Sequence, residues 1–193
     1  AGRQLLATLP QRIEAGQAGA AAALAQRISE AILTRSYKSD AGGRAYAGGA
    51  ITPGTNSTNP TSLILTNNTF TGNEARTTNT FGGRGGALAS SPNSVQITNG
   101  NFNSNTAHRD GGAFRLFTPT SINVATISNN SAQQSGGGIL SDPLAANINT
   151  FTNLTLNCNT AATGGGIFSS SGVLTISGGT VNGNTATTGK GGG

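Results

Sequence analysis

Residues able to do acid–base or metal chemistry are few in this chain of 193 residues, which carries six acidic side chains and one histidine. Enzymes that cleave acidic polysaccharides use clustered carboxylates for proton transfer or calcium binding, with an arginine or a lysine nearby. The acidic residues here are Glu14, Glu30, Asp40, Glu74, Asp110 and Asp142. Because Asp110 and Asp142 fall in different turn regions, we expect no carboxylate pair. The sequence therefore predicts no catalytic residue, no metal site, no cofactor and no enzymatic activity.

The one compact polar trio is His108-Arg109-Asp110, which stands immediately before a diglycine. Adjacent residues on a tight turn point in different directions, so we interpret the trio as a solvated corner. The chain contains no nucleophile elbow, phosphate-binding loop, zinc spacing or dinucleotide fingerprint. Its glycine runs recur at regular intervals and therefore mark turns of the fold rather than ligand loops.

The net charge of +5 suggests some affinity for polyanions. Arg84, Arg109 and Lys190 each lie one or two residues before a diglycine, so they are candidate contacts for an acidic glycan. Gln134 and Thr163 occupy that corner in the two intervening units, and a scattered solubilising charge is the other interpretation. Nucleic acid binding is not expected, because the chain has two tyrosines and no tryptophan.

Asparagines in the Asn-x-Ser/Thr pattern are candidate sites of N-glycosylation if the host glycosylates asparagine. They are Asn56, Asn67, Asn129 and Asn153. Asn56 lies in an expected loop from residue 52 to 62 and is the best-placed acceptor.

Apart from Glu14, Glu30, Asp40 and Asn56, these residues belong to, or lie between, units of a repeat written five times between Leu65 and Gly193. Each unit has an apolar residue, a second apolar residue five positions on, an asparagine three later and then a diglycine. The first apolar positions are Leu65, Ile97, Ile122, Phe151 and Ile176, and the second are Phe70, Phe102, Ile127, Leu156 and Val181. A third apolar row follows the diglycines at Ile51, Leu88, Phe114, Ile139 and Ile167. A period of about 25 residues or slightly more, with short β-type runs, indicates stacked coils.

The expected fold is all-β: a right-handed parallel β-helix with three strand rows per coil and about five to six coils. One coil cannot bury its own apolar face, so coils stack, and the handedness follows the usual chirality of parallel crossovers. The asparagines should form a structural ladder, each amide bonding its own backbone and the next coil. That ladder comprises Asn73, Asn105, Asn130, Asn159 and Asn184.

At these motifs the chain resembles the polymorphic outer-membrane protein repeats. Their signature pairs Gly-Gly-Ala-apolar with Phe-x-x-Asn, seen here at Gly85 to Leu88, Gly111 to Phe114, Phe70 to Asn73 and Phe102 to Asn105. Later units depart from this signature, because Ile127, Leu156 and Val181 stand at the position of the phenylalanine. The resemblance implies a surface-exposed β-helical passenger that serves adhesion.

Residues 1–36 differ in kind from residues 37–193, and we expect a domain boundary between them. Apolar residues spaced by three and four predict a helix over residues 20–34 that is too short and too charged to span a membrane. It would serve either as a cap on the first coil or as an arm that docks on another subunit.

The last repeat unit has no amphipathic segment to cover it, so we expect an open coil that favours head-to-tail self-association. The first residue is alanine, which suggests a mature product and a secreted or cell-surface location. The sequence favours an extracellular structural or adhesive protein, glycosylated and acting as a filament or surface-layer subunit, with itself or cell-surface glycans as partners. The alternative is a β-helix that binds or degrades acidic polysaccharides.

Overall fold

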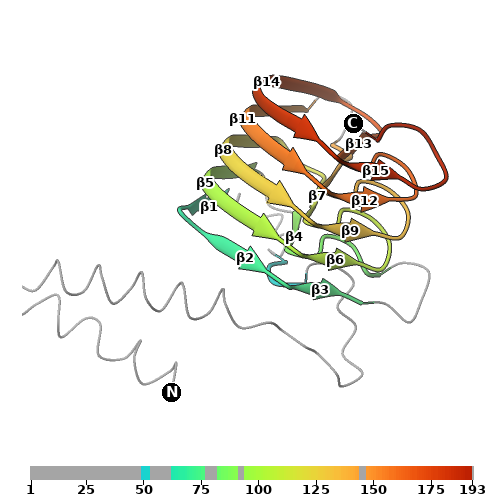
Figure 1. The fold of residues 1–193 in the computed structure, drawn as a ribbon. Helices are drawn as coiled ribbons and strands as arrows, with labels where there is room; N and C mark the ends of the chain where they lie inside the picture. Colours follow the sequence, from blue (N-terminus) through green and yellow to red (C-terminus); the bar gives the residue numbers. More distant parts are fainter. Residues whose placement is uncertain (1–48, 53–61, 77–81, 91–93, 144–146, 193) are drawn as a thin grey trace, which may run out of the picture. The chain divides into compact units, whose positions relative to one another are not determined.

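The computed structural model describes residues 49–52, 62–76, 82–90, 94–143 and 147–192. They form parallel β-sheets that wind into a β-solenoid, and no helix occurs among them (Figure 1). Each complete coil contributes one strand or strand pair to each of three sheets, as the three apolar rows predict. The predicted helix and the boundary at residue 36 lie outside the described residues.

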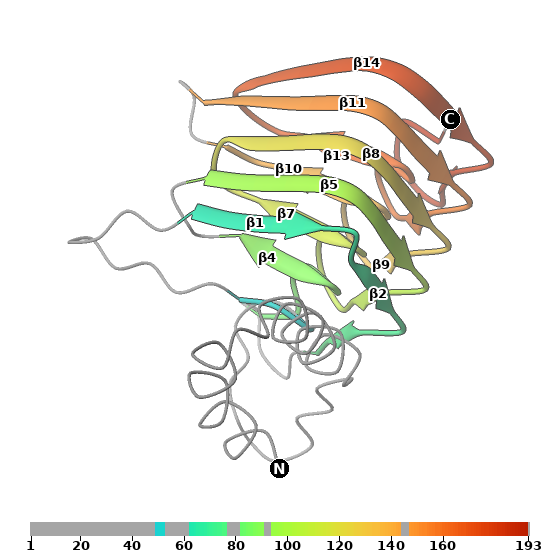
Figure 2. The same ribbon diagram turned by 90° about the vertical axis from the view of Figure 1, so that its left-hand side faces the viewer.

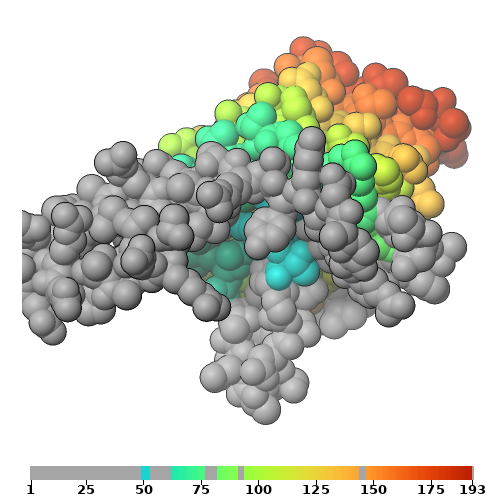
Figure 3. Space-filling model, turned by 90° about the horizontal axis from the view of Figure 1, so that it is seen from below, coloured from blue at the N-terminus to red at the C-terminus, as the bar shows by residue number. Residues whose placement is uncertain are grey.

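The sheets are named here A, B and C. Sheet B contains β1 (Ser62–Thr66), β2 (Thr69–Thr71), β5 (Ser94–Asn103), β8 (Thr120–Ser128), β11 (Ile148–Asn157) and β14 (Val173–Asn182). Sheet C contains β3 (Glu74–Ala75), β6 (Thr106–Ala107), β9 (Ser131–Ala132), β12 (Thr160–Ala161) and β15 (Thr185–Ala186). Sheet A contains β4 (Leu88–Ser90), β7 (Phe114–Leu116), β10 (Ile139–Ser141) and β13 (Ile167–Ser169). The coils lie one above another in chain order (Figures 2 and 3).

The described residues complete about four turns, fewer than the five to six expected. The difference lies at the ends. Among the described residues before β1, Gly49, Ala50 and Ile51 bond to the stack, and Ile51 forms a bridge to Leu88, while the strands described after β13 are β14 and β15. The repeat units at the two ends of the described part are incomplete coils, which accounts for the difference.

Strand alternation explains the core, because successive side chains of a strand point to opposite faces and the apolar positions of each unit share one face. All three predicted apolar rows are in register from coil to coil. Phe70 and Phe102 stack with ring centroids 5.0 Å apart, and Phe102 meets Phe114 edge-on at 4.3 Å. The rings thus join sheets B and A through the interior.

The two glycines of each diglycine have different reasons to be glycine. Gly111, the first of its pair, has φ of 67°, a conformation that L side chains rarely adopt. Gly112, the second, has no such φ, but a Cβ there would overlap the backbone oxygen of Gly137 in the next coil. One glycine therefore forms the corner, and the other allows adjacent coils to approach.

Candidate functional site

The five ladder asparagines lie in one buried column at the corner between sheets B and C. Asn105 is typical: its backbone N–H donates to Asn130 Oδ1 at 2.8 Å, and its side-chain amide donates to the same oxygen at 3.0 Å. The amide also donates at 3.1 Å to the backbone oxygen of Phe70 in the preceding coil. The prediction that each amide bonds its own backbone is wrong here, because the side chain reaches across to neighbouring coils on both sides.

The bonds between the asparagines have one direction, since Asn73, Asn105, Asn130 and Asn159 each donate to Oδ1 of the next asparagine toward the C-terminal end of the stack. Asn184 accepts from Asn159 through Oδ1, but its backbone N–H has no partner among the described residues. The column therefore ends on a donor that a further coil would satisfy.

Interior positions of β14, in the last described coil, are exposed. Ile176 is 46% exposed, whereas Phe151, its neighbour in the same row, is 0% exposed. Val181 is 52% exposed, whereas Leu156 beside it is 1% exposed. The interior positions of β14 thus form an uncovered apolar face with a free strand edge.

The corner before the diglycines of sheet A brings two predicted cations together. The Nε atoms of Arg84 and Arg109 both lie 3.4 Å from Oδ2 of Asp110. Asp110 is buried, so the prediction that the His108-Arg109-Asp110 trio is a solvated corner is wrong for Asp110. The register between the two coils explains this burial. The backbone N–H of Gly85 donates to the backbone oxygen of Asp110, which places the Asp110 carboxylate beside Arg84 of the previous coil.

Arg115 in β7 extends this cluster onto the outer face of sheet A. Its guanidinium lies 3.7 Å from the centroid of the Phe117 ring and 3.7 Å from Asp142 Oδ2. Burial lowers the pKa of Arg115 to about 10, and the charge of Arg84 adds to this shift, while the two aspartates oppose it. Burial, followed by the charge of Arg109, also lowers the pKa of Arg84. The carboxylates of Asp110 and Asp142 therefore compensate much of the positive charge of the three arginines.

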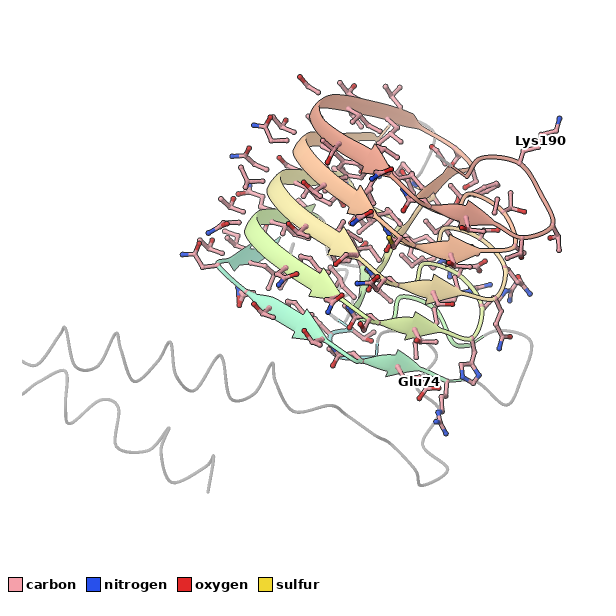
Figure 4. All side chains as sticks on the ribbon, in the orientation of Figure 1. Glu74 and Lys190 are labelled. Carbon is pink, nitrogen blue, oxygen red and sulfur yellow. The ribbon has the colours of Figure 1, made fainter. Side chains whose placement is uncertain are left out.

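Two further charged sites lie apart from this cluster. His108 Nε2 and Arg76 Nε approach Glu74 Oε1 at 2.8 and 2.7 Å, respectively. Burial raises the pKa of Glu74, but the hydrogen bonds and charges of Arg76 and His108 outweigh it and lower the pKa. Lys190 lies at the opposite end of the stack from Glu74, in the loop after β15 (Figure 4). The structure therefore joins Arg84 to Arg109 and leaves Lys190 separate.

The glycosylation candidates Asn67, Asn129 and Asn153 are all exposed, with φ of 56°, 55° and 51°. They sit at corners of sheet B, where a left-handed residue turns the chain. Asn129 already donates through its side-chain amide to Asn103 at 2.9 Å. Asn56 lies outside the described residues.

Sequence reasoning missed Arg115 and the partnership of Arg84 with Asp110. The signal that would have found them is the coil-to-coil alignment of the residue before each diglycine, combined with an outward-facing arginine in the strand that follows. Within the described ranges, no group of three or more His, Cys, Asp or Glu side chains is arranged to hold a metal ion. In the same residues, no helix has the length and apolar character needed to cross a membrane.

Comparisons of the chain with protein-family models, with curated proteins and with solved structures find no match.

Proposed function

We propose that this protein is a non-enzymatic, extracellular structural or adhesive β-helix, right-handed and of the polymorphic outer-membrane repeat type, that assembles head to tail into a filament or surface layer. The observation that supports assembly most directly is the exposure of Ile176 and Val181 in a strand whose internal counterparts are fully buried. A free strand edge beside exposed apolar residues is a template for strand addition.

The partner that best fits this end is a second copy of the chain. Each joint inside the stack is made by one repeat unit packing on the previous one, so the surface at β14 is complementary to another unit of the same repeat. The unpaired N–H of Asn184 adds to this match, because a ladder asparagine supplies the acceptor that it needs.

The two ends of the stack are not equivalent. Leu65 and Phe70 in the first coil are buried, in contrast to Ile176 and Val181 in the last. A contact between unlike surfaces of two copies is heterologous and does not close, so it builds a filament rather than a dimer. We infer that residues 1–36 either cap their own stack or dock on the open coil of a neighbour.

Electron microscopy across a concentration series tests assembly. We expect fibres with an axial repeat of one stack, and Val181→Lys should abolish them because it places a charge on the docking face. Thr180→Lys is the matched control, since Thr180 lies in the same strand and faces outward. Isolated short rods at every concentration would contradict the proposal.

Deleting residues 1–36 distinguishes the two roles of that segment. Loss of fibres from a deletion variant with an unchanged melting temperature indicates an arm, and a lower melting temperature with fibres retained indicates a cap. The alternative of a protein acting on acidic glycans has less support, because Asp110 is shared by two of its three proposed cationic contacts, Arg84 and Arg109.

A further inference from the structure

The outer face of sheet B carries no charge. The strands β1, β2, β5, β8, β11 and β14 contain no Asp, Glu, Lys, Arg or His. Charged side chains of the described residues lie instead on or beside the other two sheets, such as Glu74 in β3 and Arg115 in β7. Solvated protein faces are normally rich in charge, so an uncharged face across five coils is a departure to explain.

What replaces charge on this face is an ordered array of hydroxyl and amide groups. On each coil of sheet B, two outward-facing positions precede the left-handed corner residue and two follow it. These four positions form four columns that are in register across the coils. Every one of these positions is Thr, Ser, Asn or Gln, apart from Ile64. One column runs Thr69, Asn101, Thr126, Thr155 and Thr180, with neighbouring rows about 4.8 Å apart.

Many of these groups remain available to a ligand. The side chains of Thr98, Thr126 and Thr155 are exposed or half-exposed and hydrogen-bond no protein group in the described part of the chain. Threonine offers a methyl group beside its hydroxyl, so the array alternates small apolar and polar points.

We propose that this face binds neutral polysaccharide, a polymer whose hydroxyl and C–H groups match the array and which carries no charge. A nucleic acid or acidic glycan would find no cation here. A protein interface would need aromatic or arginine anchors, which the four columns lack. The apolar side chains exposed at outward or corner positions of these strands are aliphatic: Ile64, Val124 at the corner, and the adjacent Ile148 and Val173 at the strand starts. Because no aromatic ring is available for stacking, affinity arises from many weak contacts repeated along the stack.

This inference deepens the adhesive part of the proposed function and fails separately from the assembly part. Assembly depends on the inward side chains Ile176 and Val181, whereas binding depends on outward side chains of the same sheet. Val181→Lys should therefore abolish fibres and leave binding by each stack intact.

Pelleting of the full chain with insoluble cellulose, chitin and β-1,3-glucan tests the proposal. We expect binding to at least one of them that is unaffected by raising the NaCl concentration, because no ion pair contributes. The double variant Thr98→Glu/Thr126→Glu should bind at least about tenfold more weakly, since an unpaired charge would face a neutral ligand. The double variant Gln133→Glu/Thr188→Glu adds the same charge at exposed positions outside sheet B and should bind like the unmodified protein.

A second double variant tests whether weaker binding by the glutamate variant comes only from a folding defect. Thr98→Val/Thr126→Val removes two hydroxyls without adding charge and suits a strand, so it should stay folded and also bind more weakly. Failure of the unmodified protein to pellet with any of the three polysaccharides would overturn the proposal, as would equal binding by the folded variants. Inhibition of ice recrystallisation without polysaccharide binding would also overturn it and assign the face to ice instead.

Discussion

Asn130 Oδ1 accepts two hydrogen bonds from Asn105, one from its backbone N–H at 2.8 Å and one from its side-chain amide at 3.0 Å. Asn130 in turn donates to Asn159 Oδ1 through the same two groups. Each of the three interior ladder residues therefore satisfies buried groups in two other coils, which stabilises the stack against separation of its coils.

Replacing an interior member of this column should cost more than replacing the last, which makes three side-chain hydrogen bonds, all to the preceding coil. Asn130→Ala removes four hydrogen bonds, and it leaves the backbone N–H of Asn105 and the backbone oxygen of Phe102 without these partners. A loss of about 3 kcal/mol or more in the free energy of unfolding is expected. Urea denaturation measures it, with Asn184→Ala as the comparison, because within the described residues Asn184 bonds only to the preceding coil. Equal losses for the two variants would contradict the interpretation.

The two kinds of glycine should respond differently to alanine. Gly112→Ala should prevent native stacking, because its Cβ would overlap backbone atoms of the next coil. Gly72→Ala should cost only about 1 kcal/mol, since Gly72 has φ of 67° but nothing lies within 4 Å of an added Cβ. Circular dichroism and thermal melting of both variants provide the comparison, and a Gly112→Ala protein of native stability would refute the close-approach explanation.

Val124 is strained and its replacement should stabilise the fold. It has φ of 55° in a column whose other left-handed corner residues are Asn67, Asn99, Asn153 and Gly178. A β-branched residue is a genuine outlier in this conformation, whereas asparagine tolerates it. Val124→Asn should raise the free energy of unfolding by about 1 kcal/mol. Val124→Thr keeps the branch and should give no gain, so an equal gain from both variants would point to another cause.

The buried carboxylate of Asp110 should matter more than its exposed counterpart. Asp110→Asn leaves Arg84 and Arg109 without the anion that both approach, and we expect a loss of about 1–3 kcal/mol in stability. Glu74→Gln also breaks ion pairs, but at a more exposed site, and should cost less than about 1 kcal/mol. Chemical denaturation of both variants at pH 7 compares the two losses in the free energy of unfolding. A larger loss for Glu74→Gln than for Asp110→Asn would contradict the prediction.

The repeat in the sequence predicted the three sheets, the inward apolar rows and the position of the asparagine column. These features depend on residues close together in the chain, because alternation within a short strand decides which side chains face inward. The absence of charged residues from the strands of sheet B can also be read from the sequence, but only once the outward positions of different coils are aligned.

Only the tertiary structure decided which charged side chains meet between coils. Successive ladder asparagines are separated by 32, 25, 29 and 25 residues, so the loops absorb unequal lengths and sequence distance does not set the register. Interstrand hydrogen bonds set it instead, and they place Asp110 beside Arg84 and bury it. The open face of β14 follows equally from stacking, because a side chain at an interior position is buried only where another coil covers it.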